Sequence, residues 1–303
     1  MIEVNCFLCN GGHRTRLFRQ EGRDPYLEIV HRNLTTRELS WYVCNDCGFV
    51  YRSPMLDKLE FERLYSSYEK DVFRDRTPDA YFDSIVNLPR EQSENKQKIM
   101  WLGDNLSTLR PSVRLSAMRV LDVGCGGGTL LYTIRQELGM TRLFGVELNS
   151  AYAGLAARRA RVELKNEQYQ KGMFDQKFDL IINTKVLEHV LHPTLFLSEM
   201  VGDLNDNGIL FLEVPDISDL FVLPPSHSRF FIPHIFYYSI NTLSELLRRC
   251  NLAICTSRTV VGPSGRAYLQ VLAEGSSVVQ PPKLAPYDDP SAIIERVRCR
   301  PLL

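Results

Sequence analysis

Short apolar runs with few polar residues recur through the middle of the chain and predict the strands of a buried sheet. They lie at 120–123 and 143–146. The stretch 129–138 predicts a helix that ends at Gly139, because glycine is typical of helix C-termini. Strands that alternate with helices in this way predict an α/β fold with a doubly wound sheet.

The regions on either side predict further elements. Apolar positions at helical spacing run through residues 55–110, and Pro78 and Pro89 break the run. Near the N-terminus, residues 26–31 and 39–43 have the composition of two strands of a hairpin. The elements expected after the central region are a helix at 241–249, a hairpin of 252–261 and 267–273, and a short helix at 291–298.

A cluster of glycines stands between the first predicted strand and the first predicted helix. Its members are Gly124, Gly126, Gly127 and Gly128. A glycine turn at this place lets bare backbone approach a ligand closely. Glu147 ends the next strand, about twenty residues further on, where an acid can bind two ribose hydroxyls. The segment therefore predicts a site for a nucleoside cofactor.

Asp122 indicates which cofactor this site suits. It stands directly before the glycines, where its negative charge would repel the pyrophosphate of a dinucleotide. The same charge suits the cationic, amino-acid-bearing end of S-adenosylmethionine. The alternative is a glycine turn in another kind of doubly wound protein, since a fold alone does not fix function.

The wording Asp-Val-Gly-Cys-Gly-Gly-Gly at 122–128 closely resembles motif I of the class I S-adenosylmethionine-dependent methyltransferases. The resemblance continues through 178–182, through Val-Leu-Glu-His-Val at 186–190 and through 207–215, which resemble the fourth strand, the loop after it and the fifth strand of that fold. It implies a Rossmann-like methyltransferase fold and an enzyme that uses S-adenosylmethionine. The cofactor-binding residues that we predict are Asp122, Gly124, Cys125, Gly126, Glu147, Leu148, Asn183, Glu188 and Tyr68.

Two Cys-x-x-Cys pairs near the N-terminus predict a metal site. They are Cys6 with Cys9 and Cys44 with Cys47. Four thiolates can complete the shell of a structural zinc ion, and the expected hairpin between the pairs would make the unit a zinc ribbon. Free core cysteines or a redox pair are the alternatives. Cys125 is predicted to fill the glycine turn as a small residue, since methyl transfer needs no protein nucleophile.

This reading divides the chain into four units: a zinc ribbon at 1–54, a helical lead-in at 55–114, a cofactor-binding domain at 115–275 and a tail at 276–303. The order resembles the zinc-containing sugar and natural-product C-methyltransferases, although their further C-terminal domain is not expected here. Their Tyr-His-Glu-His signature corresponds to residues 231–234, where only His234 is kept. Phe231 and Pro233 replace the tyrosine and the glutamate, so the chemistry of carbon methylation is in doubt.

The acceptor region is predicted to follow the fifth strand. His234 is the candidate base, Tyr237 in the aromatic cluster is a second catalytic candidate, and His227 is a third. Packing in the core is the alternative for each of them. We expect methylation of an oxygen or nitrogen atom of a small polar metabolite such as a sugar. The competing functions are sugar C-methylation and a non-catalytic protein that binds S-adenosylmethionine or acts as a scaffold.

The composition of the chain indicates which classes of partner to expect. The 303 residues hold 36 basic and 36 acidic side chains, so the formal net charge is zero, and no basic run of the kind used for nucleic acid appears. The first residues lack the pattern of a secretory leader, and no apolar run has membrane-spanning length. We therefore expect a cytoplasmic protein with a small-molecule acceptor and neither nucleic acid nor membrane as a partner.

Overall fold

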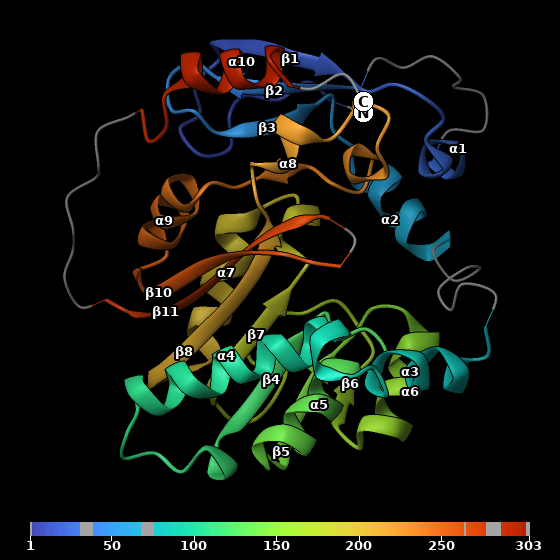
Figure 1. Ribbon diagram of the computed structural model, residues 1–303, viewed down its shortest axis with the longest axis vertical. Coiled ribbons are helices and arrows are strands. Elements are labelled where there is room, and N and C mark those ends of the chain that lie inside the picture. Colours follow the sequence, from blue (N-terminus) through green and yellow to red (C-terminus); the bar gives the residue numbers. More distant parts are fainter. Residues whose placement is uncertain (1, 31–38, 68–75, 264, 277–285, 301–303) are drawn as a thin grey trace.

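The computed structural model describes residues 2–30, 39–67, 76–263, 265–276 and 286–300. The strands within these ranges form a seven-stranded sheet and a four-stranded sheet. Figure 1 shows the small sheet at the top, covered by α10, and the large sheet below it, with helices on both faces. The predicted α/β fold class is confirmed.

The large sheet has the strand order β10-β11-β8-β7-β4-β5-β6. The five strands from β8 to β6 in this order run parallel, and the β10–β11 hairpin joins β8 antiparallel. The strands are β4 (Arg119–Val123), β5 (Arg142–Val146), β6 (Glu163–Lys165), β7 (Phe178–Thr184), β8 (Leu204–Pro215), β10 (Leu252–Val261) and β11 (Ala267–Gly275). Every strand predicted in the central and C-terminal regions is present.

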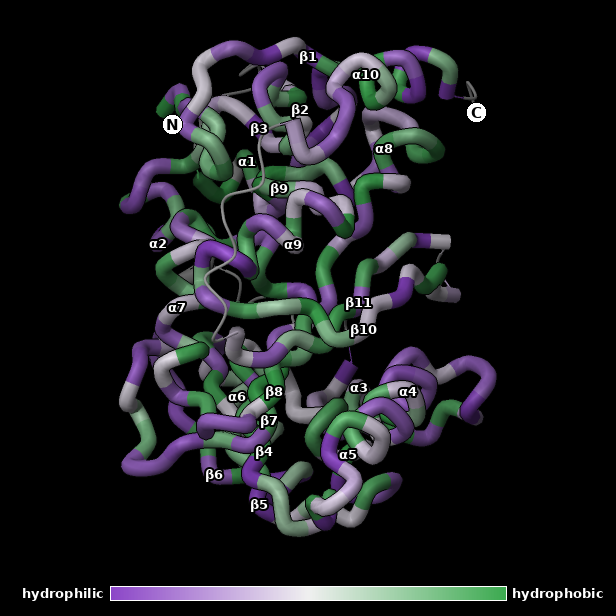
Figure 2. Tube along the Cα trace, turned by 90° about the vertical axis from the view of Figure 1, so that its left-hand side faces the viewer, coloured by the Kyte–Doolittle hydropathy of each residue, from purple (hydrophilic) through white to green (hydrophobic). Residues whose placement is uncertain are grey.

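Alternation along the strands supplies a core on each face of the large sheet. Val120 packs with residues of α4, α5 and α6, whereas the next residue, Leu121, lies in the cluster that includes α7 and α9. These helices are α4 (Glu94–Leu109), α5 (Thr129–Leu138), α6 (Ser150–Ala160), α7 (Pro193–Asp203) and α9 (Ile240–Arg249). Figure 2 shows the matching concentration of hydrophobic residues at the centre of the sheet.

The small sheet combines segments from two distant parts of the chain. Its order is β1-β2-β3-β9, with β1 at Arg14–Arg19, β2 at Ser40–Cys44, β3 at Val50–Ser53 and β9 at Phe236–Tyr237. Val50 pairs with Tyr237, so the last strand comes from the region after β8. Trp41 is fully buried against Phe230 and Tyr237, and α10 (Pro290–Arg298) adds Ile293 and Val297 to this core.

The strand predicted at 26–31 is wrong. Residues Pro25–Val30 form helix α1, because Asp24 caps its N-terminus by accepting from Tyr26 N at 3.0 Å and Pro25 suits the first helical position. The strand that pairs with β2 is β1 instead. The remaining short elements are α2 (Lys58–Ser67), α3 (Pro78–Val86), α8 (Asp219–Val222) and the 3₁₀ turns η2 (Arg90–Gln92), η3 (Leu115–Ala117), η4 (Leu187–His189) and η5 (Ser228–Phe230).

Two other expectations bear on these outer elements. Pro78 begins α3 with Thr77 as the cap, whose Oγ1 accepts from Ala80 N at 3.2 Å, and Pro89 directly precedes η2, so each proline stands at the start of a separate helical element. The helix predicted at 291–298 is present as α10. In the part of the chain that the structure describes, no helix is both long and apolar enough to cross a membrane.

Two glycines that bracket α5 allow the packing of the glycine loop to be tested. Both are left-handed, with φ +76° at Gly128 and +65° at Gly139, but a Cβ at Gly128 would lie 2.8 Å from Ala156 Cβ, whereas one at Gly139 meets nothing within 4 Å. We expect Gly139→Ala to lower the free energy of unfolding by about 1–2 kcal/mol and Gly128→Ala by about 2–4 kcal/mol. Urea denaturation of both variants measures the difference, and equal losses would contradict a packing role for Gly128.

Candidate functional site

The glycine loop joins β4 to α5 at the carboxyl edge of the large sheet. Gly124 and Gly126 have positive φ, +81° and +53°. A Cβ at Gly124 would lie 2.5 Å from Val186 Cγ2, whereas one at Gly126 would meet nothing within 4 Å. The first position is therefore glycine because the segment after β7 packs against it. The second leaves open space beside the backbone, as a close-fitting ligand requires.

Two buried polar side chains beside this loop have an oxygen without a hydrogen-bond partner among the described residues. They are Asp122 on β4, with Oδ1 unpaired, and Asn183 on the adjacent β7, with Oδ1 unpaired while its Nδ2 donates to Val123 O at 2.9 Å. Burial raises the pKa of Asp122 to about 7, although Lys98 opposes the shift. An unsatisfied buried acceptor costs about 1–3 kcal/mol, so both oxygens suit a ligand that donates hydrogen bonds, such as an ammonium group.

Glu147 follows β5 and joins the glycine loop directly. Its Oε2 accepts from Gly126 N and its Oε1 from Asn149 N, both at 2.8 Å, and burial raises its pKa. Each oxygen keeps a second lone pair for a ligand hydroxyl. Leu148 beside it is 49% exposed, whereas Cys125 in the loop is buried. Burial raises the pKa of the Cys125 thiol well above its usual value, which fits a packing residue better than a nucleophile.

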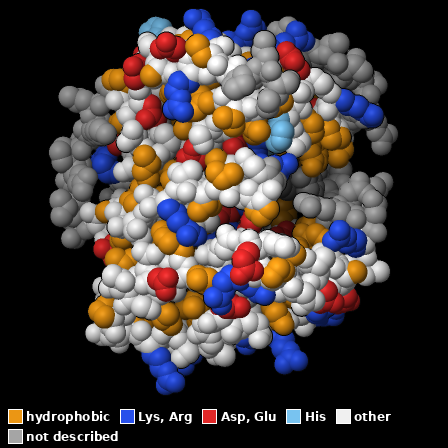
Figure 3. Space-filling view, viewed as in Figure 1, with side chains coloured by type: hydrophobic (Ala, Val, Ile, Leu, Met, Phe, Trp, Pro, Cys, Tyr) orange, Lys and Arg blue, Asp and Glu red, His pale blue; other side chains and the backbone are white. Residues whose placement is uncertain are grey.

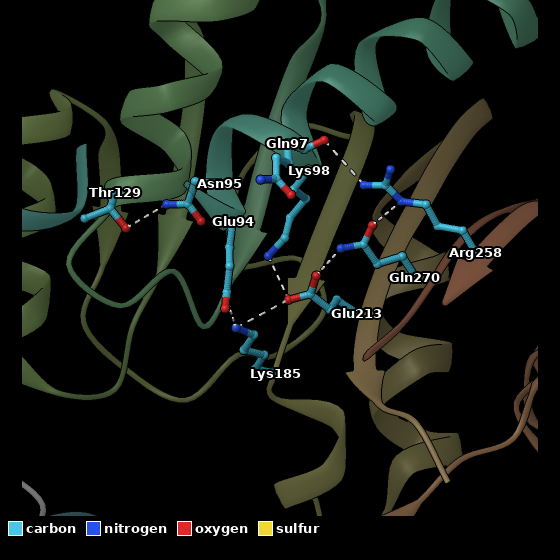
Figure 4. A network of polar contacts seen from close by, with 9 residues as sticks. All are labelled: Glu94, Asn95, Gln97, Lys98, Thr129, Lys185, Glu213, Arg258 and Gln270. Atoms are coloured by element: carbon cyan, nitrogen blue, oxygen red, sulfur yellow. Dashed lines mark hydrogen bonds and ion pairs between the residues drawn. The ribbon is translucent and has the colours of Figure 1, made fainter. Parts of the chain in front are cut away.

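A buried network of charges, which sequence reasoning missed, lies next to this site. Figure 4 shows its centre, where Lys98 Nζ lies 2.7 Å from Glu213 Oε1 and Lys185 Nζ lies 3.8 Å from the same atom. Lys185 also pairs with Glu94 at 2.7 Å, and Gln270 Nε2 donates to Glu213. Burial alone would raise the pKa of Glu213, but the two lysines outweigh it and lower the pKa. The network thus fixes α4 against β8 at the edge where the site lies.

The segment after β7 brings together three residues that can handle a proton. Glu188 and His189 belong to η4, and His234 comes from the loop before β9. A carboxylate oxygen of Glu188 and one ring nitrogen of each histidine all lie within 4.8 Å of one another. His189 Nδ1 donates to Pro233 O at 2.7 Å, so its Nε2 faces Glu188 Oε1 at 3.8 Å. The two histidine rings meet edge to face, with centroids 4.8 Å apart. Val186 connects this group to Gly124, so the group adjoins the glycine loop.

Burial shifts the proton affinities of this group in opposite directions. It raises the pKa of Glu188, which is 1% exposed and whose Oε2 has no partner among the described residues. It lowers the pKa of His234 well below the usual value, and the charges of His189 and Arg229 add to the effect. A carboxyl with a raised pKa and an imidazole with a lowered one are closer in proton affinity than the same groups in water.

The structure gives the other two catalytic candidates packing and capping contacts. Tyr237 is fully buried, donates its hydroxyl hydrogen to Arg229 O at 3.2 Å and packs edge to face on Trp41 with ring centroids 5.0 Å apart. His227 caps η5, since its Nδ1 accepts from Arg229 N at 3.1 Å. We therefore assign Tyr237 to the core of the small sheet. Tyr68, predicted to cover the cofactor, lies outside the described residues.

The two Cys-x-x-Cys pairs converge on one point beside the small sheet. All four Sγ atoms lie within 4.8 Å of one another, with Cys6 and Cys47 3.5 Å apart and Cys9 and Cys44 also 3.5 Å apart. These separations far exceed the length of a disulfide bond, about 2 Å, and approach the ~3.8 Å between sulfur atoms around a tetrahedral zinc ion. The residue after each pair is left-handed, Asn10 with φ 61° and Gly48 with φ 79°.

The molecular surface is hollowed between the two sheets. Figure 3 shows a recess between the level of the small sheet and that of the β10–β11 hairpin, with hydrophobic side chains and a histidine along its upper border.

The sequence is similar to that of known methyltransferases over most of the region that forms the large sheet. A model of the methyltransferase domain family matches residues 92–257. A ubiquinone biosynthesis O-methyltransferase of Agrobacterium fabrum is 31% identical over 115 residues, which make up 36% of this chain and 44% of that enzyme. The chain thus spans less than half the length of this curated relative.

Solved structures show the fold at low sequence identity. The 1,6-didemethyltoxoflavin-N1-methyltransferase of Burkholderia thailandensis, with bound S-adenosylhomocysteine, aligns with a TM-score of 0.53 at 18% identity and covers 81% of this chain and 99% of that one. An S-adenosylmethionine-dependent methyltransferase of Clostridium acetobutylicum aligns with a TM-score of 0.51 at 11% identity, covering 66% and 98%. Since the family model matches more than half of the chain, the protein belongs to the methyltransferase domain family and has the α/β fold of S-adenosylmethionine-dependent methyltransferases.

Proposed function

We propose that the protein transfers a methyl group from S-adenosylmethionine to an oxygen or nitrogen atom of a small polar acceptor, such as a sugar or a natural-product intermediate. The observation that carries this proposal is the pair of unpartnered buried oxygens on Asp122 and Asn183, next to an open glycine loop. The Agrobacterium relative is an O-methyltransferase, which supports a heteroatom as the acceptor.

The residues at the carboxyl edge fit this cofactor. Asp122 and Asn183 would hold its amino-acid end, and Gly124 and Gly126 would pass close along it, with Cys125 filling the turn behind them. Glu147 would bind the ribose hydroxyls, and Leu148 and Glu188 would flank the bound nucleoside and its methionine portion. When bound, S-adenosylmethionine supplies a methyl group that its sulfonium has already activated.

His234 would remove the proton from the acceptor atom. It is neutral near pH 7 because its pKa is lowered, so it can accept a proton, and the carboxyl group of Glu188 lies close enough to stabilise the resulting positive charge. Carbon methylation would instead need a second group to hold an oxyanion. Phe231 has no hydroxyl group for that task, and Pro233 has no carboxylate that could serve as the base for carbon deprotonation. These features favour an oxygen or nitrogen acceptor over the carbon acceptor of the sugar C-methyltransferases.

A structural zinc ion in the cysteine cluster is the second part of the proposal. Four converging thiols with sulfur separations near those of a tetrahedral site support it, and four sulfur ligands would leave no open position for chemistry. On this basis residues 1–54 would form a zinc ribbon, 55–114 a helical lead-in, 115–275 the cofactor-binding domain and 276–303 a tail. The unit at 1–54 is not self-contained, because β9 completes its sheet.

Loss of the metal should follow loss of one thiolate. We expect the purified protein to contain one zinc per chain by elemental analysis and Cys44→Ser to lose it, with a lower melting temperature, because three thiolates hold zinc less well. Cys255→Ser is the control, since Cys255 lies outside the cluster, and it should keep the metal. A wild-type protein that is stable and free of metal would contradict the zinc assignment.

Cofactor binding should release a proton below pH 7. Free Asp122 has a pKa of about 7, and an ammonium ligand needs its carboxylate form, so binding must displace the proton. We expect the affinity for S-adenosylhomocysteine to rise as much as about tenfold per pH unit between pH 5 and 6.5 and to level off above 7. Calorimetry at pH 6 in two buffers of different ionisation enthalpy counts the protons released.

The control for this measurement is Asp122→Asn, which keeps the shape of the side chain and cannot release a proton. It separates Asp122 from Glu147, whose pKa burial also raises. Proton release of the same size in Asp122→Asn would assign the titration to another group. Unchanged affinity in that variant would remove Asp122 from the cofactor site.

The transfer reaction is tested directly with labelled S-adenosylmethionine and a small-molecule extract, followed by mass spectrometry and NMR of the methylated product. We expect a new oxygen–methyl or nitrogen–methyl bond. His234→Ala should reduce turnover roughly a hundredfold while cofactor binding is kept, because a general base is lost. His13→Ala is the control, since His13 is 85% exposed beside Asp46.

Three outcomes would contradict parts of this proposal. A new carbon–methyl bond would favour the sugar C-methyltransferase alternative. Near-normal turnover of His234→Ala would move the base to another residue, His227 being the next candidate. Cofactor binding without any labelled product would favour a non-catalytic binding or scaffold protein.

A further inference from the structure

The loop that carries His234 is held by the N-terminal module, which we define as residues 2–30 and 39–54. Asp24 Oδ2 accepts from Ile232 N at 2.6 Å. Arg52 donates from Nη1 to Ile232 O and from its backbone N to Ile235 O, the latter at 2.9 Å. Both backbone groups of Ile232 are therefore bound by side chains of this module, from α1's cap and from β3 respectively.

The large sheet holds the same loop from the other side. Ile235 N donates to Glu188 O at 2.8 Å, and Pro233 O accepts from His189 Nδ1 at 2.7 Å. His234 N donates to Phe231 O at 3.0 Å, which closes the turn. The residues on both sides of His234 are thus held, Ile232 by the N-terminal module, Pro233 by η4 and Ile235 by both.

Arg52 is an unusual residue for the interior of a small sheet. Its side chain is fully buried, and burial of a guanidinium is costly unless its donors are used. The backbone of Arg52 already serves the sheet, where it pairs with Trp41. The side chain instead donates hydrogen bonds to the carbonyl groups of Phe231 and Ile232, so it binds the loop that carries His234.

We propose that Asp24 and Arg52 are positioning residues of the acceptor site: they fix the backbone of residues 231–235 so that His234 faces His189 and Glu188. The N-terminal module then helps to form the acceptor site, because it holds the loop that carries His234. This inference rests on the proposed function for the role of His234, but the positioning itself can be measured without turnover.

The charges around His234 make the position of the loop observable. The groups that face it are His189 and Glu188 of η4, Arg229 of η5, Arg52 of β3 and Arg266 before β11. Burial and the neighbouring positive charges lower its pKa in the intact loop. Release of the loop would bring water to the imidazole and raise this pKa toward the ordinary value of about 6.5.

The test is an NMR titration of the histidine ring protons, with the His234 signal assigned by its loss in His234→Gln; the full chain has six histidines, so the spectrum is small. The variants are Arg52→Met and Asp24→Asn. They remove charges of opposite sign, so a direct charge effect alone would shift the pKa of His234 up in the first and down in the second. Release of the loop predicts an upward shift in both, of about one pH unit or more.

Arg14→Met is the matched control, because Arg14 lies on β1 of the same sheet and contacts Glu3, the Val4 carbonyl and the Tyr42 ring. It should leave the His234 titration unchanged. Opposite shifts in the two test variants, no shift in either, or an equal shift in Arg14→Met would each overturn the proposal. If Arg52→Met does not fold, Asp24→Asn decides alone, since an upward shift there cannot come from loss of its charge.

Binding of S-adenosylhomocysteine and turnover separate this inference from the proposed function. Both variants should bind the cofactor product with wild-type affinity in calorimetry, because neither side chain contacts the glycine loop through any described hydrogen bond. Turnover with the identified acceptor should fall about tenfold or more in kcat at unchanged KM for S-adenosylmethionine. If the wild type transfers no methyl group, the proposed function fails while the titration still decides the positioning role.

Discussion

Close packing between the glycine loop and the segment after β7 is the constraint on which the site depends. Val186 fills the space where a side chain at Gly124 would lie, and Ala156 of α6 does the same at Gly128. These contacts draw the ends of β4 and β7 together and leave no room for any residue larger than glycine. Asp122 and Asn183 lie at these two strand ends, and each has one oxygen without a partner among the described residues, beside backbone that a ligand can approach.

The buried acids at this edge are of two kinds: one stabilises the fold, and the other belongs to the candidate site. Glu213 has two lysines and a glutamine around it, its pKa is lowered, and it fastens α4 to the sheet. Asp122 and Glu188 have raised pKa values, and each keeps one oxygen without a partner among the described residues. A fully paired acid stabilises the fold, whereas an unpaired one keeps a cost that a ligand or a proton can relieve. Glu213 lies on β8 and Asp122 on β4, with β7 between them, and Glu188 lies in η4 after β7, so both kinds of acid are held by the same part of the large sheet.

Local sequence predicted the elements whose signals are local. The strand, glycine turn and helix from 119 to 139 and the C-terminal hairpin follow from periodicity and from glycine placement, and they appear at nearly the expected bounds. The apolar composition of 26–31 favours a strand, whereas the Asp24-Pro25 pair is the better signal and favours a helix. The pairing of β9 with β3 and the inward turn of Lys98 could not be predicted, because both depend on contacts between residues far apart in sequence.

The two sheets are joined by the same short stretch that carries the candidate base. Residues 231–235 satisfy their backbone groups on both sides, and the next two residues become the fourth strand of the small sheet. The C-terminal segment adds a further link, since Tyr287 N donates to Cys47 O at 3.1 Å and Asp288 packs where any side chain at Gly48 would lie. A shift of the cysteine-bearing knuckles would therefore pass through β3 to the loop before β9. Strand β9 pairs with β3, and the buried side chain of Arg52 binds the loop, so the loop has little freedom to move independently of the small sheet.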